Sequence, residues 1–98
     1  MYVIRDIFRC KPGKAKDLVG KFKRSIESME RVDGFTNVRL MVDAVADYWT
    51  VVLESDVETL DQFERHLQEW GARAEVREAM EGYMDLVDGG RREIFRIV

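Results

Sequence analysis

Residues 35–58, FTNVRLMVDAVADYWTVVLESDVE, decide the fold, because they hold two strand patterns joined by a short connection. In the first pattern, residues 35–42, apolar side chains at every second position indicate a β-strand. The second pattern covers residues 48–53 and is rich in aromatic and β-branched residues. The link between them, residues 43–47, is of hairpin length, and so short a link joins antiparallel neighbours. The stretch therefore predicts an antiparallel β-hairpin.

Helical patterns lie on both sides of this hairpin. Upstream, apolar residues recur at helical spacing over residues 15–29, and Asp33-Gly34 is a typical helix end. Downstream, Ser55-Asp56-Val57-Glu58 has the form of a capping box, which predicts a second helix from that point. Gly71 should break or bend this helix, and a third helical stretch follows from about Arg73.

Two further strand patterns complete the chain. Residues 2–10 are rich in β-formers and stop at Pro12-Gly13, and residues 93–98 follow a predicted turn at Asp88-Gly89-Gly90. The order is then βαββααβ, which predicts one α+β domain over residues 1–98 with a ferredoxin-like fold. Its antiparallel sheet would have four strands and carry the helices on one face.

The other face of the predicted sheet is too apolar to remain bare. If Trp49 faces the helices, the open face carries Phe35, Met41, Tyr48 and Val52. An exposed apolar face of this size favours a protein partner, and the simplest partner is a second copy related by a twofold axis. We therefore predict a homodimer packed sheet to sheet, which is a dimeric α/β barrel.

Composition excludes several classes of partner. The chain has 16 Lys and Arg against 19 Asp and Glu, for a net charge of −3. The one aromatic residue of its basic first helix, Phe22, belongs to the apolar stripe, so no aromatic residue accompanies the Lys cluster on the charged face for nucleic-acid binding. The single cysteine, Cys10, allows no intrachain disulfide. No charged leader and no apolar run of ~18 residues is evident, so no membrane partner is expected and the cytoplasm is the expected location.

Four stretches resemble the dimeric α/β-barrel superfamily, and within it the antibiotic-biosynthesis-monooxygenase-like (ABM-like) proteins. They are YVIRDIFRCKPGKAKDLVGKFKRSIE (2–27), VDGFTNVRLMVD (32–43), YWTVVLESDVETLDQFERHLQEW (48–70) and REIFRIV (92–98). The shared motifs are structural and include no catalytic signature. The resemblance implies a ferredoxin-like fold and a dimer. The superfamily includes cofactor-independent monooxygenases, haem degraders, isomerases and members without a known activity.

The resemblance does not extend to haem degradation. Haem-degrading relatives use an Asn on the first strand, a Trp on the second helix and a His about ten residues further on, whereas here residues 2–10 contain no Asn and Val76 and Met80 stand ten residues after His66 and Trp70. A single His without a Cys-x-x-Cys motif or clustered carboxylates offers no metal site. We therefore predict no cofactor and no metal.

Two residues are candidates for a general base. His66 lies beside the apolar stripe of the second helix, four residues before Trp70, where it could serve as a base or simply border the stripe. Arg5 and Asp6 are adjacent in a strand and so point to opposite faces, but the pattern leaves open which one faces the helices.

Whether Asp6 can act as a general base depends on its environment. Within the helix-side layer, its pKa would be perturbed and it would become a second base candidate. The alternative is an ion pair with Arg39, Arg92 or Arg96 that merely neutralises its charge.

Aromatic residues suggest a ligand cavity between the helices and the sheet. Tyr48, Trp49, Trp70 and Tyr83 could line it, with Arg39 holding an anionic group, although the same aromatics could also be ordinary core packing. The first functional hypothesis is a protein that binds a small apolar or aromatic ligand in this space. The alternative is a cofactor-independent monooxygenase acting on a polycyclic phenol, with Asp6 or His66 as the base.

Overall fold

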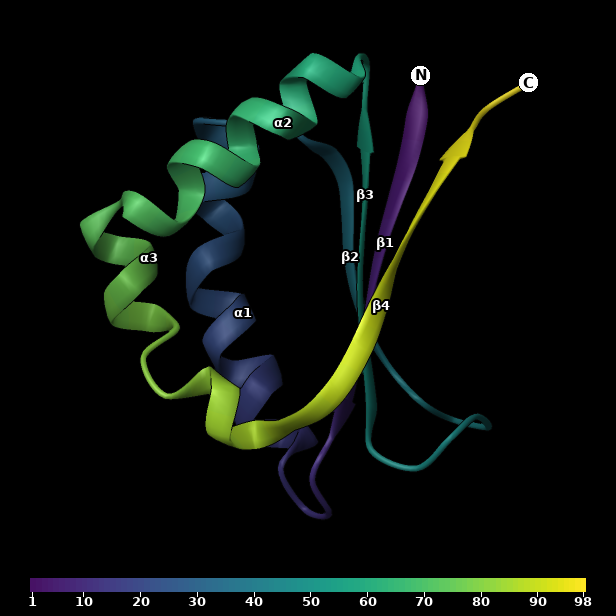
Figure 1. The fold of residues 1–98 in the computed structure, drawn as a ribbon, viewed down its shortest axis with the longest axis vertical. Helices are drawn as coiled ribbons and strands as arrows, with labels where there is room; N and C mark the ends of the chain where they lie inside the picture. The colour runs from purple at the N-terminus through teal and green to yellow at the C-terminus, as the bar shows by residue number, and fades with distance from the viewer.

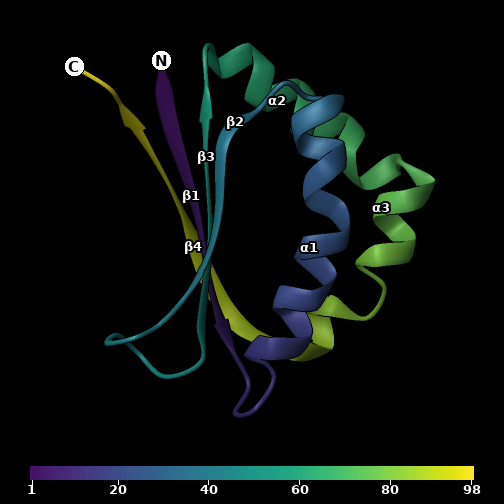
Figure 2. The ribbon, with the colours of Figure 1, turned by 180° about the vertical axis from the view of Figure 1, so that it is seen from behind.

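The computed structural model describes residues 1–98 and has the predicted order of elements. The strands are β1 (Tyr2–Cys10), β2 (Thr36–Val42), β3 (Thr50–Val57) and β4 (Val87–Arg96), and the helices are α1 (Ala15–Arg31), α2 (Leu60–Glu69) and α3 (Ala74–Ala79). Two short 3₁₀ turns, η1 (Trp70–Ala72) and η2 (Tyr83–Leu86), follow α2 and α3. The four strands form one antiparallel sheet in the order β2-β3-β1-β4, and all three helices lie on one side of it (Figures 1 and 2). The ferredoxin-like prediction is confirmed.

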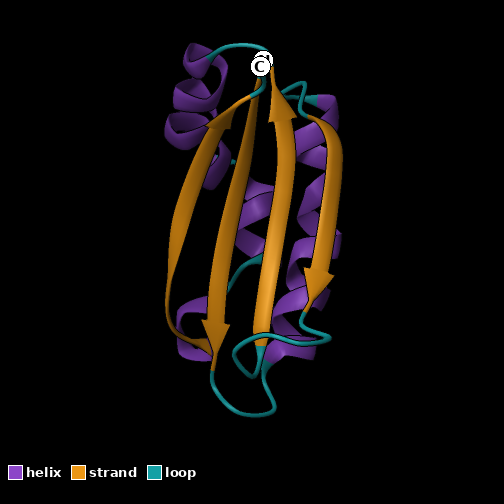
Figure 3. Ribbon diagram, turned by 90° about the vertical axis from the view of Figure 1, so that its right-hand side faces the viewer, coloured by secondary structure: helices purple, strands orange, loops and turns teal.

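The register of the central strand β1 settles which of its charged residues faces the helices. Asp6 lies opposite Leu53 of β3 and Arg92 of β4, and it lines the space beneath the helices. Arg5 lies opposite Glu54 and points to the other side of the sheet, which Figure 3 shows free of helices. Since side chains alternate along a strand, this register also separates a helix-side face from an open face throughout the sheet.

Helix α1 supplies much of the core against the helix-side face. Its apolar stripe buries Leu18, Phe22 and Met29, and the strands contribute Ile4 and Val51. The charged face of α1 stays in water, so the helix is held by burial of one stripe. None of the helices is both long enough and apolar enough to cross a bilayer.

The predicted start of the second helix was wrong. Ser55 lies in β3, which pairs with β1 as far as Val57. The residues that the pattern assigned to a helix cap therefore form cross-strand pairs instead. The observed cap is Thr59, whose Oγ1 accepts a hydrogen bond from the backbone N–H of Gln62 at 3.1 Å. The Gln62 side chain in turn accepts the backbone N–H of Glu58 at 3.0 Å. The arrangement resembles a capping box, except that the Gln62 side chain binds the residue before the N-cap rather than the N-cap residue itself.

Two turns also differ from prediction. Trp49 has φ 63°, a left-handed conformation that ends the hairpin loop, so β3 begins at Thr50 and Tyr48 lies in the loop. The predicted turn at residues 88–90 is part of β4, and a β-bulge at Arg9/Cys10 adjusts the pairing there. A Cβ at Gly90 would collide with the carbonyl of Ile7, so this glycine allows close approach of two strands rather than a turn.

The open face of the sheet is mixed in character. Met41 and Val52 lie on it as predicted, but Phe35 is buried in the core and Tyr48 lies in the hairpin loop. The apolar residues of this face are Val3, Ile7, Met41, Val52 and Phe95. Figures 1 and 2 show the loop between β2 and β3 projecting to this same side of the sheet.

Candidate functional site

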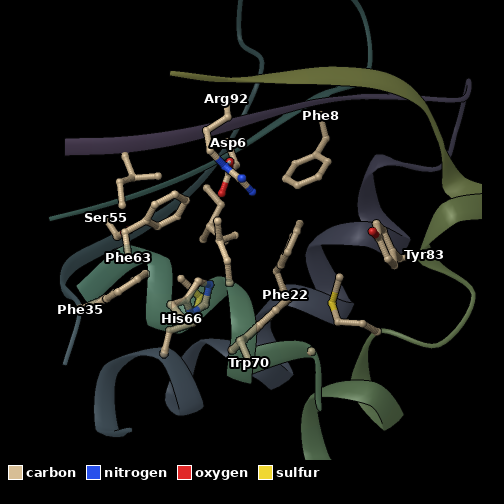
Figure 4. Close-up of a pocket in the computed structure, with 16 residues that line it drawn as sticks. Asp6, Phe8, Phe22, Phe35, Ser55, Phe63, His66, Trp70, Tyr83 and Arg92 are labelled. Atoms are coloured by element: carbon tan, nitrogen blue, oxygen red, sulfur yellow. Dashed lines mark hydrogen bonds and ion pairs between the residues drawn. The ribbon is translucent and has the colours of Figure 1, made fainter. Parts of the chain in front are cut away.

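A cavity of about 220 Å³ lies between the helices and the sheet. Eleven of the 16 residues that line it are hydrophobic. The 16 residues come from β1, β3 and β4 on one side and from α1, Phe35, α2 and the segments after α2 on the other (Figure 4). An engineered cavity of ~150 Å³ holds benzene, whereas drug-sized ligands occupy ~300–1,000 Å³. This cavity therefore suits a molecule of one or two rings.

One polar wall of the cavity is an ion pair between neighbouring strands. Oδ1 of Asp6 accepts a hydrogen bond from Nε of Arg92 at 2.5 Å. The Arg92 guanidinium carbon also lies 5.0 Å from the ring centre of Phe63, in a cation–π arrangement. Of the three partners that the sequence left open for Asp6, Arg92 is the one observed. Because this pairing compensates the charge of Asp6, it weakens the case for this carboxylate as a proton acceptor.

The opposite wall carries the only histidine. The side chain of His66 is 10% exposed, and its ring centre lies 4.6 Å from that of Phe35 and 5.3 Å from that of Trp70. Nδ1 lies 2.8 Å from Oδ2 of Asp33, while Nε2 makes no hydrogen bond within the chain. His66 therefore lines the cavity with one ring nitrogen already engaged and the other available.

Asp33, at the end of α1, is held by more than the histidine. Nη2 of Arg73 lies 2.6 Å from its Oδ1 and Nη1 lies 3.0 Å from its Oδ2, and Nη1 also donates to Oγ of Ser28 at 2.9 Å. Burial alone would raise the pKa of Asp33, but the hydrogen bonds from Arg73 and His66 outweigh it and hold that pKa below its usual value. The Asp33 side chain is only 4% exposed. It is thus a buried carboxylate stabilised in its charged form.

The sequence prediction missed the roles of Asp33 and Arg73. Asp33 was interpreted only as part of a helix end and Arg73 only as the start of the third helix. The two residues are 40 positions apart, and no local motif links them. A charged residue at the boundary of each of two helical stretches, Asp33 at an end and Arg73 at a start, was the only available signal.

The structure brings four of the seven predicted site residues to the cavity. They are Asp6, His66, Trp70 and Tyr83. The indole N–H of Trp70 is buried and has no hydrogen-bond partner, which is rare for a buried donor.

The other three predicted residues lie elsewhere. Arg39 is on the open face of the sheet, where it pairs with Glu54. Tyr48 and Trp49 lie at the hairpin loop and border a shallow hollow beside Val19 and Val42. The left-handed turn at Trp49 leaves both aromatics outside the strand in which they were expected to lie.

A second charged cluster occupies the open face. The side chain of Glu54 is 5% exposed, accepts a hydrogen bond from Nη2 of Arg5 at 2.8 Å, and contacts Arg39. The hydrogen bond from Arg5 has the largest effect on Glu54 and, with that from Arg39, holds its pKa below the usual value against the opposing effect of burial. This cluster lies across the sheet from the cavity, so it is not part of the cavity wall.

Neither a metal centre nor an activated thiol is built into the chain. No group of three or more His, Cys, Asp and Glu side chains is arranged to hold a metal ion. Cys10 is buried, and burial, assisted by the nearby Asp88, raises the pKa of its thiol. A buried thiol of raised pKa is a poor nucleophile.

The fold and the site define a ferredoxin-like α+β protein that encloses a small, mostly apolar cavity with polar groups on two walls. Solved structures share this fold over nearly the whole chain. An uncharacterised NIPSNAP-like domain protein from Burkholderia xenovorans has a TM-score of 0.82 at 19% identity, with 99% of this chain and 84% of that one covered.

Two further neighbours show the same likeness. A NIPSNAP family protein from Agrobacterium tumefaciens has a TM-score of 0.84 at 14% identity, with 99% of this chain and 92% of that one covered. A candidate antibiotic biosynthesis monooxygenase from Nitrosomonas europaea has a TM-score of 0.78 at 17% identity, with coverage of 100% and 99%. The sequence matches no protein-family model and no curated protein. At these identities the comparisons establish the ferredoxin-like fold alone.

Proposed function

We propose that this chain binds a small, flat, largely apolar molecule in the cavity between the sheet and the helices. The observation that carries the proposal is the cavity itself, about 220 Å³ with a mostly hydrophobic lining and polar side chains at opposite walls. Such an arrangement, apolar with a few placed polar groups, is typical of small-molecule sites. Its volume favours one or two rings over the polycyclic ligand that the sequence suggested.

Tryptophan fluorescence can test this proposal directly. The chain has two tryptophans, and Trp70 lines the cavity whereas Trp49 does not. In a Trp49→Phe background, binding of a one- or two-ring aromatic fragment should change the emission of Trp70 in a saturable way. The proposal would be contradicted if a panel of such fragments produced no saturable change in emission and no chemical-shift changes in nuclear magnetic resonance titrations.

A cavity-filling variant provides the specificity control. Ser55 lies in β3, is buried and lines the cavity, so Ser55→Ile places additional side-chain volume there in a residue type suited to strands. Affinity should fall about ten-fold or more, because the ligand and the new side chain compete for one volume. Val52→Ile, a smaller enlargement on the open face of the same strand, should leave affinity unchanged.

A second candidate function is a cofactor-independent monooxygenase. The observation that favours it is the Asp33–His66 pair at the cavity wall, since an oriented imidazole can take the proton of a phenol. The phenolate would supply the electrons itself, so that phenol and O₂ give a quinone and water. Oxygen uptake with a phenol, abolished in His66→Gln while ligand binding persists, would support it. Binding without oxygen uptake would favour the simple binding protein.

We also infer that the open face pairs with a second copy of the chain. Its apolar residues include Phe95, which is 49% exposed, and the charge of Glu54 is already balanced by Arg5 and Arg39. A mixed face whose charged residues pair with one another can pack through its apolar residues against its twofold mate. Native mass spectrometry should report a dimer, and Val52→Arg should yield monomers. A wild-type chain that stays monomeric at high concentration would refute this inference.

A further inference from the structure

We infer that Asp33 is a positioning residue that presents Nε2 of His66 to the cavity as a hydrogen-bond acceptor, so that the site selects a one- or two-ring aromatic molecule with a hydroxyl group. The inference rests on the proposed ligand-binding function and assigns the ligand's polar group. It starts from the two nitrogens of the imidazole: Nδ1 is bound to Asp33, while Nε2 has no partner within the chain, and His66 lines the cavity.

The chemistry of the carboxylate determines which nitrogen carries the proton. An ionised carboxylate can only accept hydrogen bonds, so Nδ1 of His66, 2.8 Å away, must be the donor. In the neutral ring the remaining nitrogen then carries a lone pair. A buried carboxylate fixes the histidine tautomer in the same way in hydrolytic triads.

The clamp on Asp33 keeps this orientation rigid. Both carboxylate oxygens are bound by Arg73, at 2.6 and 3.0 Å, and Ser28 holds the same guanidinium. The side chains of Asp33 and Arg73 are 4% and 13% exposed, so little water competes for them. A two-point arginine clamp prevents rotation of the carboxylate, and therefore of the imidazole that it holds.

On the opposite wall the carboxylate of Asp6 is already part of an ion pair. Asp6 is already bound to Arg92 at 2.5 Å, and Arg92 is held against the Phe63 ring. On the wall that carries His66, a ligand hydroxyl can donate its proton to the unpaired Nε2. An aromatic hydroxyl therefore matches this wall, and an aromatic hydrocarbon does not.

Nitrogen nuclear magnetic resonance tests the positioning role without any ligand. The chain has one histidine, so its imidazole signals need no assignment. At a pH where the ring is neutral, the wild type should show Nδ1 protonated and Nε2 unprotonated. Asp33→Asn, whose amide can donate to Nδ1, should shift the population toward the Nε2–H tautomer. Glu54→Gln, at an equally buried and arginine-bound carboxylate on the open face, should keep the wild-type tautomer.

A wild-type ring protonated at Nε2 would overturn the inference, and this result requires no variant to fold. An unchanged tautomer in folded Asp33→Asn would overturn it as well. A merely structural role for Asp33 predicts loss of stability without any change of tautomer.

Phenol and toluene, which are nearly equal in shape, test the hydroxyl preference. The ratio of phenol to toluene affinity should fall by about ten-fold in Asp33→Asn, because the acceptor is lost, and stay unchanged in Glu54→Gln. An equal ratio in wild type and Asp33→Asn would overturn the ligand assignment. If neither compound binds the wild type, the proposed function fails, while the tautomer measurement still decides the role of Asp33.

Discussion

Nδ1 of His66 lies 2.8 Å from Oδ2 of Asp33, although 33 residues separate them in the chain. Asp33 follows α1 and His66 lies near the end of α2, so this contact ties two helices together at the cavity wall. Arg73, at the start of α3, joins the same carboxylate. One buried charge thus organises all three helices on the helix-side face.

This arrangement predicts a large effect on stability when the carboxylate is removed. Asp33→Ala leaves the Arg73 guanidinium buried without its partner, and breaking a buried pair on one side costs about 3 kcal/mol or more. Arg73→Met should cost a similar amount for the converse reason. The double variant should lose less than the sum of the two, because the second change relieves the unpaired charge. Urea unfolding measures all three, and strict additivity would contradict the coupling.

The pH dependence of stability has a definite sign. The pKa values of Asp33 and Glu54 are both lowered in the folded chain. A carboxyl group whose pKa is lower in the folded than in the unfolded state stabilises the fold above the unfolded value of ~4, and this contribution disappears as pH falls through the folded pKa. The free energy of unfolding should therefore decrease below about pH 4.

Variants identify the source of that pH dependence. In Asp33→Asn and Glu54→Gln the slope of unfolding free energy against pH should be shallower between about pH 5 and pH 2, since each removes one titrating group. The comparison is of slopes and not of absolute stability. A slope equal to that of the wild type in both variants would show that other carboxylates dominate acid unfolding.

Cys10 should be inert in the native protein. Its side chain is buried, and burial raises the pKa of the thiol, so little thiolate is present or accessible. A chromogenic disulfide reagent should react slowly without denaturant and at the normal rate of a free thiol in strong urea. Rapid reaction under native conditions would mean that the end of β1 opens readily.

Two glycines should respond in opposite ways to alanine. Gly90→Ala should destabilise the chain by roughly 1–3 kcal/mol, because the new methyl group collides with the backbone of β1 at Ile7. Gly20→Ala should stabilise it by about 0.5–1 kcal/mol, because Gly20 is inside α1 and its Cβ would meet open space. Thermal unfolding of the two variants gives the comparison, and stabilisation by Gly90→Ala would contradict the observed strand register.

The local pattern of the sequence determined the order of helices and strands. The apolar stripe of α1 and the short link of the hairpin are periodic features that a window of neighbouring residues expresses. The same features led to the ferredoxin-like fold, because few topologies join these elements without connections that cross one another. Element ends were predicted less well. Ser55 belongs to β3 because β1 lies beside it, and no local window contains that information.

Tertiary structure alone decided the site. Alternation along β1 showed that Arg5 and Asp6 point to opposite faces, but only pairing with β3 and β4 assigned Asp6 to the cavity and gave it Arg92 as a partner. The pairing of Asp33 with Arg73 likewise joins residues that no spacing rule connects. Hydrophobic periodicity is set by the geometry of one element, whereas charged partners are chosen by the packing of several elements together.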